Sequence, residues 1–362
     1  MNVFTDLFAS VIITSFNRYS NLVRLLVLLQ KQTLSINQFE VIIINDGSSD
    51  ETKKIISKLS TSYPLVYLEQ AHNGPASARN KGLNYCKGEV VVFFDDDIEP
   101  MPECLEEHLK LHCDNKHNIV FGKTPVSPHN INKSNYPNPH GFPRIQLESL
   151  RYQHKQCLPW EYFITCNLSL RLEDIIRVNG FSPRFPFANY EDLELGYKLY
   201  LQNNGGSFIF NEEALAYHFH YRTFSEKVQW AVKNGLSRMI MLELHPELYE
   251  RCLKVCHYNN GSYVNLLEVE LMSLLEEAER YQRIIELEEN ILRFKEDNEE
   301  LFKEYNREVK KMLIYYESLG VKIFKYGINS TMPKIAKEIA LEYFQLIKGR
   351  DQKNHLRVIN CI

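Results

Sequence analysis

The chain has 362 residues and a formal net charge of −4, so it is long enough for two globular domains. Its 42 Lys and Arg against 46 Asp and Glu give no basic excess, which argues against general nucleic-acid binding. Eight cysteines form no CxxC pair, so we interpret them as reduced thiols rather than as disulfides or zinc ligands.

The N-terminal residues lack the basic segment and apolar core of a signal peptide. No apolar run has the length that spanning a bilayer requires. We therefore expect a protein without a transmembrane segment, either free in the cytoplasm or peripheral to the membrane.

Strand and helix patterns alternate over the first hundred residues. A capping box at Ser48 and Glu51 predicts a helix that runs to about Leu59, and Gly74-Pro75 opens another. This order predicts a mostly parallel, Rossmann-like sheet with flanking helices. The other predicted elements are strands at Ala9–Thr14, Phe39–Ile44, Leu65–Leu68 and after Glu89, and a helix at Ser20–Gln30.

An acidic triplet, Asp95, Asp96 and Asp97, follows the last of these strands, EVVVFF. Three adjacent negative charges need a cation or exposure to water. Open α/β sheets bind ligands at the carboxyl ends of their strands, and Mg²⁺ and Mn²⁺ prefer oxygen ligands. The triplet therefore predicts a divalent-metal site that holds a phosphorylated ligand, with a solvated acidic turn as the plainer interpretation.

Polar residues also follow the first two strands, so they should lie at the same edge of the sheet. Asp46 can accept an N–H from a nucleobase, although Asp-Gly is also a common turn. Arg79, on the helix after Gly74, can supply a fixed cation to the nucleotide. The remaining candidates for nucleotide binding are Thr14, Phe16, Asn17, Arg18 and Ser48.

The segments TSFNR, INDGSSDET, NGPASARNKG and FFDDD, in this order and spacing, resemble the family 2 glycosyltransferases with the GT-A fold. The resemblance covers about residues 10–238. It implies an inverting transfer from a nucleotide-sugar donor, usually a uridine diphosphate sugar, with Mn²⁺ or Mg²⁺ as cofactor. By the same resemblance, Asp46 would recognise the base, Asp95 would contact the ribose or the metal, and Asp97 would ligate the metal; Asp96 lies between them on the donor side.

The acceptor half of the family pattern resembles ITCNLSLRLEDIIRVNGF followed by NYEDLELGYKL. Asp192 matches the catalytic base, with Glu191 beside it. A single displacement needs such a base because the acceptor hydroxyl loses its proton as it attacks. The alternative for Glu191-Asp192 is that both charges complement the dipole of the following helix, and both roles can hold together.

Several further residues are weaker candidates. Related enzymes often place a histidine near the metal, which suggests His218 and, less strongly, His220, although a structural role is common. Trp160, Glu161 and Asn167 are candidates for the acceptor side, with core packing an equal explanation for Trp160. The Pro- and Asn-rich stretch Ser127–Arg144 is interpreted as a long loop over the active site.

We assign residues 1–250 to the catalytic domain and 262–362 to a C-terminal helical module. Apolar residues recur there in a 3-4 rhythm that Gly320 is expected to end. The module is either a helical hairpin that caps the catalytic domain or a coiled coil that forms a homo-oligomer or docks an acceptor.

The leading hypothesis is a metal-dependent inverting glycosyltransferase of the hexosyl or N-acetylhexosaminyl type. Its acceptor would be a hydroxyl of a glycan, lipid-linked, peptide or small-molecule substrate. A sugar nucleotidyltransferase is an alternative, but TSFNR lacks the glycine-rich loop of that class. A non-catalytic nucleotide-binding scaffold with a helical tail is the other.

Overall fold

A computed structural model of the chain describes residues 7–114, 118–125, 127, 157–202, 207–219, 223–249, 254–256, 263–266, 269, 272, 274–294, 299–326 and 332–347. His220 and, apart from Ser127, the predicted loop Ser127–Arg144 lie outside these residues. The chain divides into two compact units. Unit 1 comprises Met1–Asn130, Ile145–Pro183 and Glu191–His220, and unit 2 comprises Ile131–Arg144, Arg184–Tyr190 and Tyr221–Ile362.

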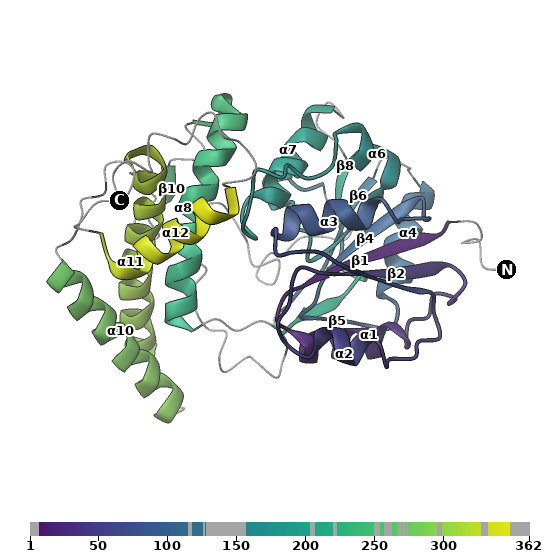
Figure 1. The fold of residues 1–362 in the computed structure, drawn as a ribbon, viewed down its shortest axis with the longest axis horizontal. Coiled ribbons are helices and arrows are strands. Elements are labelled where there is room, and N and C mark those ends of the chain that lie inside the picture. Colours follow the sequence, from purple (N-terminus) through teal and green to yellow (C-terminus); the bar gives the residue numbers. More distant parts are fainter. Residues whose placement is uncertain are drawn as a thin grey trace. The chain divides into compact units, whose positions relative to one another are not determined.

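Unit 1 is built on a seven-stranded sheet in the order β3-β2-β1-β4-β7-β6-β8 (Figure 1). Strands β1 to β4 are parallel, as predicted, whereas β7 runs antiparallel to both of its neighbours. The sheet strands are β1 (Ala9–Ser15), β2 (Phe39–Asn45), β3 (Leu65–Glu69), β4 (Val90–Asp95), β6 (Asn118–Gly122), β7 (Asn167–Arg171) and β8 (Ser207–Asn211). This architecture confirms the predicted mostly parallel sheet with flanking helices.

The helices of unit 1 cover both faces of the sheet, which is why its central strands are continuously apolar. On one face, Leu22 and Leu26 of α1 share a buried core with Val11 and Val41. On the other face, Gly82 of α3 lies against Ile12 and Ile44 of the sheet. The helices are α1 (Tyr19–Leu29), α2 (Thr52–Ile56), α3 (Pro75–Leu83), α4 (Cys104–Asp114), η2 (Trp160–Tyr162), α6 (Leu172–Arg177) and α7 (Glu191–Gln202).

The capping box predicted at Ser48 and Glu51 is wrong. Helix α2 begins at Thr52, where the Asp50 carboxylate accepts the Thr52 N–H at 3.1 Å. The Ser48 hydroxyl instead accepts the Asn17 N–H at 2.9 Å. This contact joins the loop after β1 to the loop after β2, so the serine organises the strand ends rather than the helix.

In the described part of unit 2 the regular elements are helices and an antiparallel pair of short strands, β10 (Lys254–Cys256) and β11 (Tyr263–Asn265). Its helices are α8 (Phe224–Leu244), η3 (Pro246–Leu248), α10 (Leu274–Phe294), α11 (Glu299–Tyr326) and α12 (Lys334–Ile347). The compact units thus divide near Tyr221, and α8 groups with the later helices. The predicted domains 1–250 and 262–362 stay a prediction.

Helices α10 and α11 lie antiparallel. This is shown by two ion pairs between them, Arg283 with Glu304 and Arg280 with Glu308. Helix α11 continues through Gly320 to Tyr326, so the expected break at this glycine is wrong. Tertiary packing overrides its low helix propensity. Oligomer formation through these helices stays a prediction.

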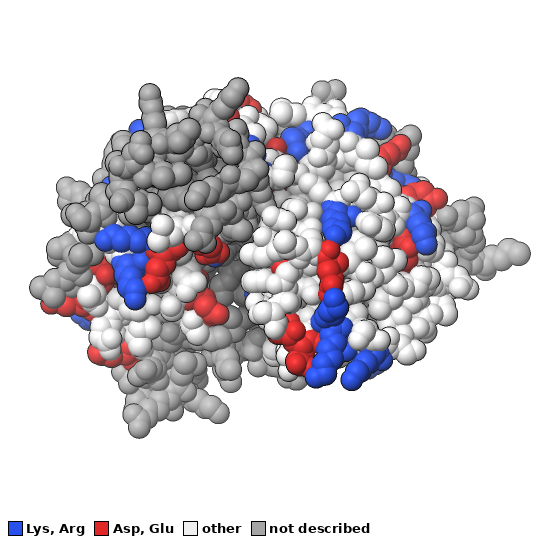
Figure 2. Space-filling view, viewed as in Figure 1, with Lys and Arg blue, Asp and Glu red and all other residues white. Residues whose placement is uncertain are grey.

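Among the described helices, none combines the length and apolar character that crossing a bilayer requires. On the face of unit 1 that Figure 2 shows, Lys and Arg lie in a narrow band together with Asp and Glu. Two of the ion pairs on unit 1 join Lys53 to Glu69 and Lys54 to Glu51. Such interspersed charges differ from the basic stripe of a nucleic-acid-binding face.

Candidate active site

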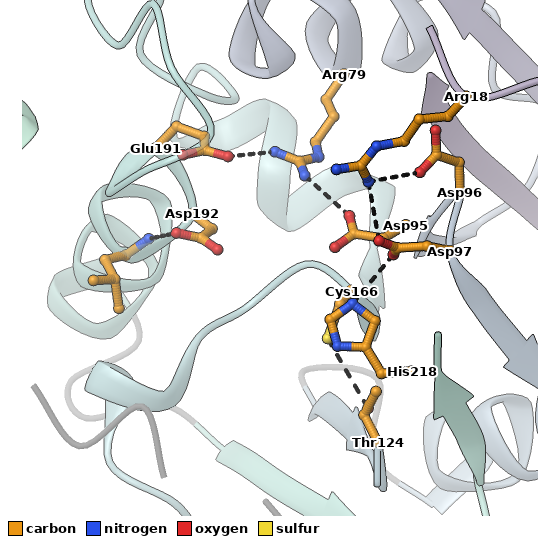
Figure 3. A network of polar contacts seen from close by, with 11 residues as sticks. Arg18, Arg79, Asp95, Asp96, Asp97, Thr124, Cys166, Glu191, Asp192 and His218 are labelled. Carbon is orange, nitrogen blue, oxygen red and sulfur yellow. Dashed lines mark hydrogen bonds and ion pairs between the residues drawn. The ribbon is translucent and has the colours of Figure 1, made fainter. Parts of the chain in front are cut away.

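The predicted strand-end residues do meet at one edge of the sheet. In the parallel register, Ser15 at the end of β1 lies opposite Asn45 at the end of β2, and Thr14 lies opposite Asp95 at the end of β4. The loops that follow these strands carry Arg18, Asp46 and the rest of the acidic triplet. A parallel sheet therefore gathers residues that are far apart in the sequence, and Figure 3 shows Arg18 beside the acidic triplet.

The three aspartates of the triplet have different surroundings. Asp96 and Asp97 are buried, with 4% and 2% exposure, whereas the Asp95 side chain is one third exposed. One Nη atom of Arg18 lies 3.2 Å from Asp96 and 2.9 Å from Asp97. Burial, with the nearby Asp97 charge, raises the pKa of Asp96 to about 7, although Arg18 and the Ser15 hydroxyl oppose the shift.

Asp95, Asp97 and His218 form a group that can hold a cation. One ligand atom from each of them lies within 4.8 Å of the other two. The His218 Nε2 contacts the Asp97 carboxylate at 3.1 Å. Strand β9 (Ala216–His218) pairs antiparallel with β5 (Ile98–Pro100), and this pairing delivers the histidine to the triplet. The two carboxylates supply the oxygen ligands that Mn²⁺ and Mg²⁺ prefer, and the imidazole nitrogen is a ligand type of transition metals.

The Glu191-Asp192 pair begins α7 and projects toward the triplet (Figure 3). The buried Arg79 guanidinium lies 2.8 Å from Glu191 and 3.5 Å from Asp95, so it bridges the two acidic groups. Burial, with the charge of Asp192, raises the pKa of Glu191 to about 7, and Arg79 opposes the shift. Asp192 is 5% exposed, and its carboxylate accepts the Leu193 N–H at 2.8 Å.

Asp46 lies in a tight loop whose backbone and side chains hold its carboxylate. It accepts hydrogen bonds from the Gln70 side chain at 2.7 Å and from the backbone N–H groups of Asn73 and Gly74, both at 2.9 Å. His72 Nδ1 also lies 2.9 Å from it. Although burial acts in the opposite direction, hydrogen bonds from His72, Asn73 and Gln70 lower the pKa of Asp46.

An aromatic surface adjoins Asp46. The ring of Phe16, which is 41% exposed, stacks on the His72 ring with centroids 4.1 Å apart. Asn17 holds the loop in place, because its side-chain oxygen accepts the Ser49 N–H at 2.8 Å. Its own φ of 55° is left-handed, a region in which asparagine is among the tolerated residues.

The predicted acceptor-side residues lie in different settings. Trp160 is 4% exposed and packs on Tyr197, with ring centroids 4.8 Å apart. Asn167 is 2% exposed, contacts His108 at 2.8 Å and donates to the Ala214 carbonyl at 2.8 Å. Glu161 is partly buried within η2. Acceptor roles for these residues stay predictions.

Sequence reasoning missed the contributors from the end of β3. Gln70, His72 and Asn73 all bind Asp46 and follow the third strand. Their signal is the same strand-end position as after β1, β2 and β4, since β3 is parallel to β2. Ser15, the second residue of the TSFNR segment, is another missed contributor, because its hydroxyl donates to Asp96 at 2.7 Å.

The fold and the site together define an α/β protein with an acidic sheet edge whose residues can hold a cation. Residues 10–176 match the family model described as glycosyl transferase family 2. This part of the chain is similar to the family 2 glycosyltransferases, and the fold agrees with the GT-A fold that the sequence motifs predicted.

Curated relatives are also glycosyltransferases. Validoxylamine A glucosyltransferase from Streptomyces hygroscopicus subsp. jinggangensis is 29% identical over 214 residues, which are 53% of this chain and 51% of that protein. The chain spans about half the length of the validoxylamine A glucosyltransferases that it matches. The hyaluronan synthase of Pasteurella multocida is 23% identical over 287 residues, which are 71% of this chain and 29% of that protein.

Among solved structures, the crystal structure of S. aureus TarS 1-349 is similar in fold. It has a TM-score of 0.50 and 17% identity, and the match covers 89% of this chain and 93% of that one. At this identity the likeness concerns the fold alone.

Proposed function

We propose that this protein is a metal-dependent, inverting glycosyltransferase that transfers a sugar from a uridine diphosphate sugar to an acceptor hydroxyl. The observation that carries the proposal is the Arg79 bridge. It connects a metal-competent group, Asp95 with Asp97 and His218, to the Glu191-Asp192 pair. A single displacement needs both parts, one for the leaving diphosphate and one for the acceptor proton.

On the donor side, Asp95, Asp97 and His218 would hold Mn²⁺ or Mg²⁺. When bound, such an ion neutralises the charge that develops on a diphosphate leaving group. Arg18 already places a cation between Asp96 and Asp97. Its side chain is 42% exposed, so it is able to turn toward the diphosphate and to exchange its place with another cation.

Asp192 is proposed as the general base, and Glu191 as its support. One Glu191 oxygen is taken by Arg79 at 2.8 Å, so this carboxylate is held in an ion pair. Asp192 shares the same helix start, where the N-terminal N–H groups favour a negative charge. The acceptor hydroxyl would pass its proton to Asp192 as its oxygen attacks the anomeric carbon.

The base of the donor nucleotide is proposed to bind at Asp46 and Phe16. The four groups on the Asp46 carboxylate leave no easy place for a further donor, so one of them has to move. His72 is the candidate, because its side chain is 37% exposed while two of the others are backbone amides. A uracil N–H would then replace the His72 contact, and Phe16 would stack on the ring.

The names of the relatives support a proposal for the class of sugar that is transferred. The relatives carry the names of a glucosyltransferase and of synthases of hyaluronan and chondroitin. We therefore propose a hexosyl or N-acetylhexosaminyl donor. The acceptor would be a hydroxyl on a glycan, a lipid-linked sugar, a peptide or a small molecule.

A screen of nucleotide sugars tests the proposal. The full chain is incubated with UDP-glucose, UDP-galactose or UDP-N-acetylglucosamine in Mn²⁺ or in EDTA, and released UDP is measured. We expect slow, metal-dependent UDP release from at least one donor, faster when a suitable acceptor is added. Asp192→Asn should lower the acceptor-stimulated rate, whereas Asp174→Asn, a buried carboxylate that pairs with Arg177 on α6, should not. Absence of release from every donor would contradict the proposal.

A further inference from the structure

The segment Arg184–Tyr190 belongs to the helical unit 2, although the catalytic pair Glu191-Asp192 follows it directly in the chain. Its last residue, Tyr190, has a φ of 69°, a left-handed conformation that is a genuine outlier for a bulky side chain. Such strain persists only where the surroundings enforce it, and it concentrates at functional sites.

Helix α8 contacts the segment along most of its length. Lys233 lies over the Phe187 ring at 4.6 Å, and the Asn189 side chain donates to the Trp230 carbonyl at 3.5 Å. At the end of the segment, the Arg238 guanidinium lies 5.4 Å from the Tyr190 ring centroid. A guanidinium within about 6 Å of a ring is attracted to its face, most strongly when both are desolvated.

Arg238 and Tyr190 are both desolvated, with 0% and 2% exposure. A buried guanidinium needs a buried partner, and Glu317 of α11 supplies it. The Glu317 carboxylate accepts from the Arg238 Nε and from the Asn234 side chain. Glu317 itself is 1% exposed, so Tyr190, Arg238 and Glu317 are all buried within unit 2.

Helix α11 comes close enough for Glu317 to contact Arg238 because α8 and α11 cross at two glycines, Gly235 and Gly320. A Cβ added at Gly235 would lie 2.0 Å from the Glu317 carbonyl oxygen, and one added at Gly320 would lie 2.1 Å from the Val232 carbonyl oxygen. Backbone therefore meets backbone at this crossing. The contact fixes the position of Glu317 relative to Arg238. It thereby also fixes the position of the guanidinium over the Tyr190 ring.

We propose that Arg238, held by Glu317, is a positioning residue that fixes the strained Tyr190 backbone and so sets the direction of Glu191 and Asp192. The proposal rests on the proposed function in its assignment of Asp192 as the general base. It gives the C-terminal helices a part in the transfer step. A misplacement of about 1 Å in a reacting group can cost about a hundredfold in rate, so a small relaxation at Tyr190 is enough to be measured.

The test compares two variants of the full chain. Arg238→Met combined with Glu317→Gln removes both charges, which avoids a lone buried ion, and the glutamine oxygen still accepts from Asn234. Ser318→Ala is the matched control. Ser318 is buried on the same helix, and its hydroxyl donates to the Leu266 carbonyl at 2.7 Å, away from Arg238.

The first measurement is amide hydrogen exchange followed by mass spectrometry, which needs no substrate. In the double variant, peptides that cover residues 184–193 should exchange about tenfold faster, because local opening becomes easier. The Leu193 amide, which donates to Asp192, is among the expected reporters. Peptides from β1 to β4 should be unchanged, and Ser318→Ala should leave residues 184–193 as in the original chain.

The second measurement uses the UDP-sugar that the screen identifies. The double variant should lose about 10- to 100-fold in kcat with less than about twofold change in donor KM or in UDP affinity. Unchanged exchange at residues 184–193, or an equal increase in Ser318→Ala, would overturn the proposal. So would a kcat that falls only with the fraction of folded protein.

Failure of the proposed function has a different signature. If Asp192→Asn keeps full turnover, Asp192 is not the base, and the kinetic part of the proposal is overturned with it. Faster exchange at residues 184–193 in the double variant would then still support the structural part, in which Arg238 holds Tyr190.

Discussion

Two acidic groups of the site are each paired with an arginine, and the two arginines differ in how far their side chains are exposed to solvent. The cluster proposed for the donor side, Asp96 and Asp97, contacts Arg18, whose side chain is 42% exposed. Glu191, proposed for the acceptor side, contacts Arg79, whose side chain is 7% exposed. An exposed side chain can leave at little cost, whereas separating a buried pair leaves an uncompensated charge. The cluster at Arg18 is thus suited to exchange its cation, and the pair at Arg79 to keep its geometry, as the proposed donor and acceptor roles require.

The largest expected effect concerns the two carboxylates of the acceptor side. Asp192→Asn should lower kcat by about 10²–10⁴-fold, because it removes proton abstraction alone. Glu191→Gln, which still accepts from Arg79, should cost far less. UDP affinity of both variants, measured by calorimetry, should stay near that of the original chain. Equal kinetic losses in the two variants would show that the carboxylates act as a unit.

The two arginines should differ in what they contribute to stability. Arg79→Met leaves Glu191 buried without its partner and should cost about 3–5 kcal/mol in the free energy of unfolding. Arg18→Met should be less harmful, and Mn²⁺ should restore part of its loss, because the ion can replace the guanidinium beside Asp97. Thermal unfolding with and without Mn²⁺ measures both effects. The comparison fails if Mn²⁺ rescues the two variants equally.

Removal of the metal should affect the donor side alone. At a UDP concentration about 100 times its Kd, bound ligand stabilises a protein by about 2.7 kcal/mol, which gives a clear shift in melting temperature. We expect the UDP-induced shift to shrink in EDTA and in Asp97→Ala. Glu191→Gln should keep the full shift. A metal-independent shift in the original chain would contradict the assignment of Asp97.

The smallest expected effect is the pH dependence of the Asp46 loop. The pKa of Asp46 is lowered in the folded protein, so its stabilisation is present above its ordinary value of 3.8 and is lost as the pH falls below it. The difference in stability between the original chain and Asp46→Ala should therefore narrow as the pH falls from about 5 to below about 4. Urea unfolding across this range measures it, and a difference that widens toward acid would refute the sign.

The sequence predicts the sheet edge well because a parallel sheet obeys a simple rule. Once the apolar strands are recognised, the residues after β1, β2 and β4 must meet, and Asp46 and Asp95–Asp97 do so. The Arg79 bridge could not be predicted in this way. Arg79 and Glu191 are 112 residues apart, and their contact depends on the packing of α7 near α3.

The helical unit was harder to interpret for a related reason. Local propensity favours a helix end at Gly320, but the close approach of α8 requires a glycine there, and the helix continues. The 3-4 rhythm indicated amphipathic helices correctly. The rhythm does not indicate that these helices pack against α8, whose Arg238 lies some 80 residues before its partner Glu317.

The glycine crossing of α8 and α11 has a practical consequence for anyone who shortens this protein. At that point the Val232 carbonyl and Gly235 lie against the backbone of α11, and the apolar α8 residues Val228, Ala231 and Leu236 are fully buried. A chain that stops before Gly320 would leave this strip of α8 facing water or another molecule. We expect such truncated chains to precipitate on expression, so the practical limit of trimming lies beyond α11.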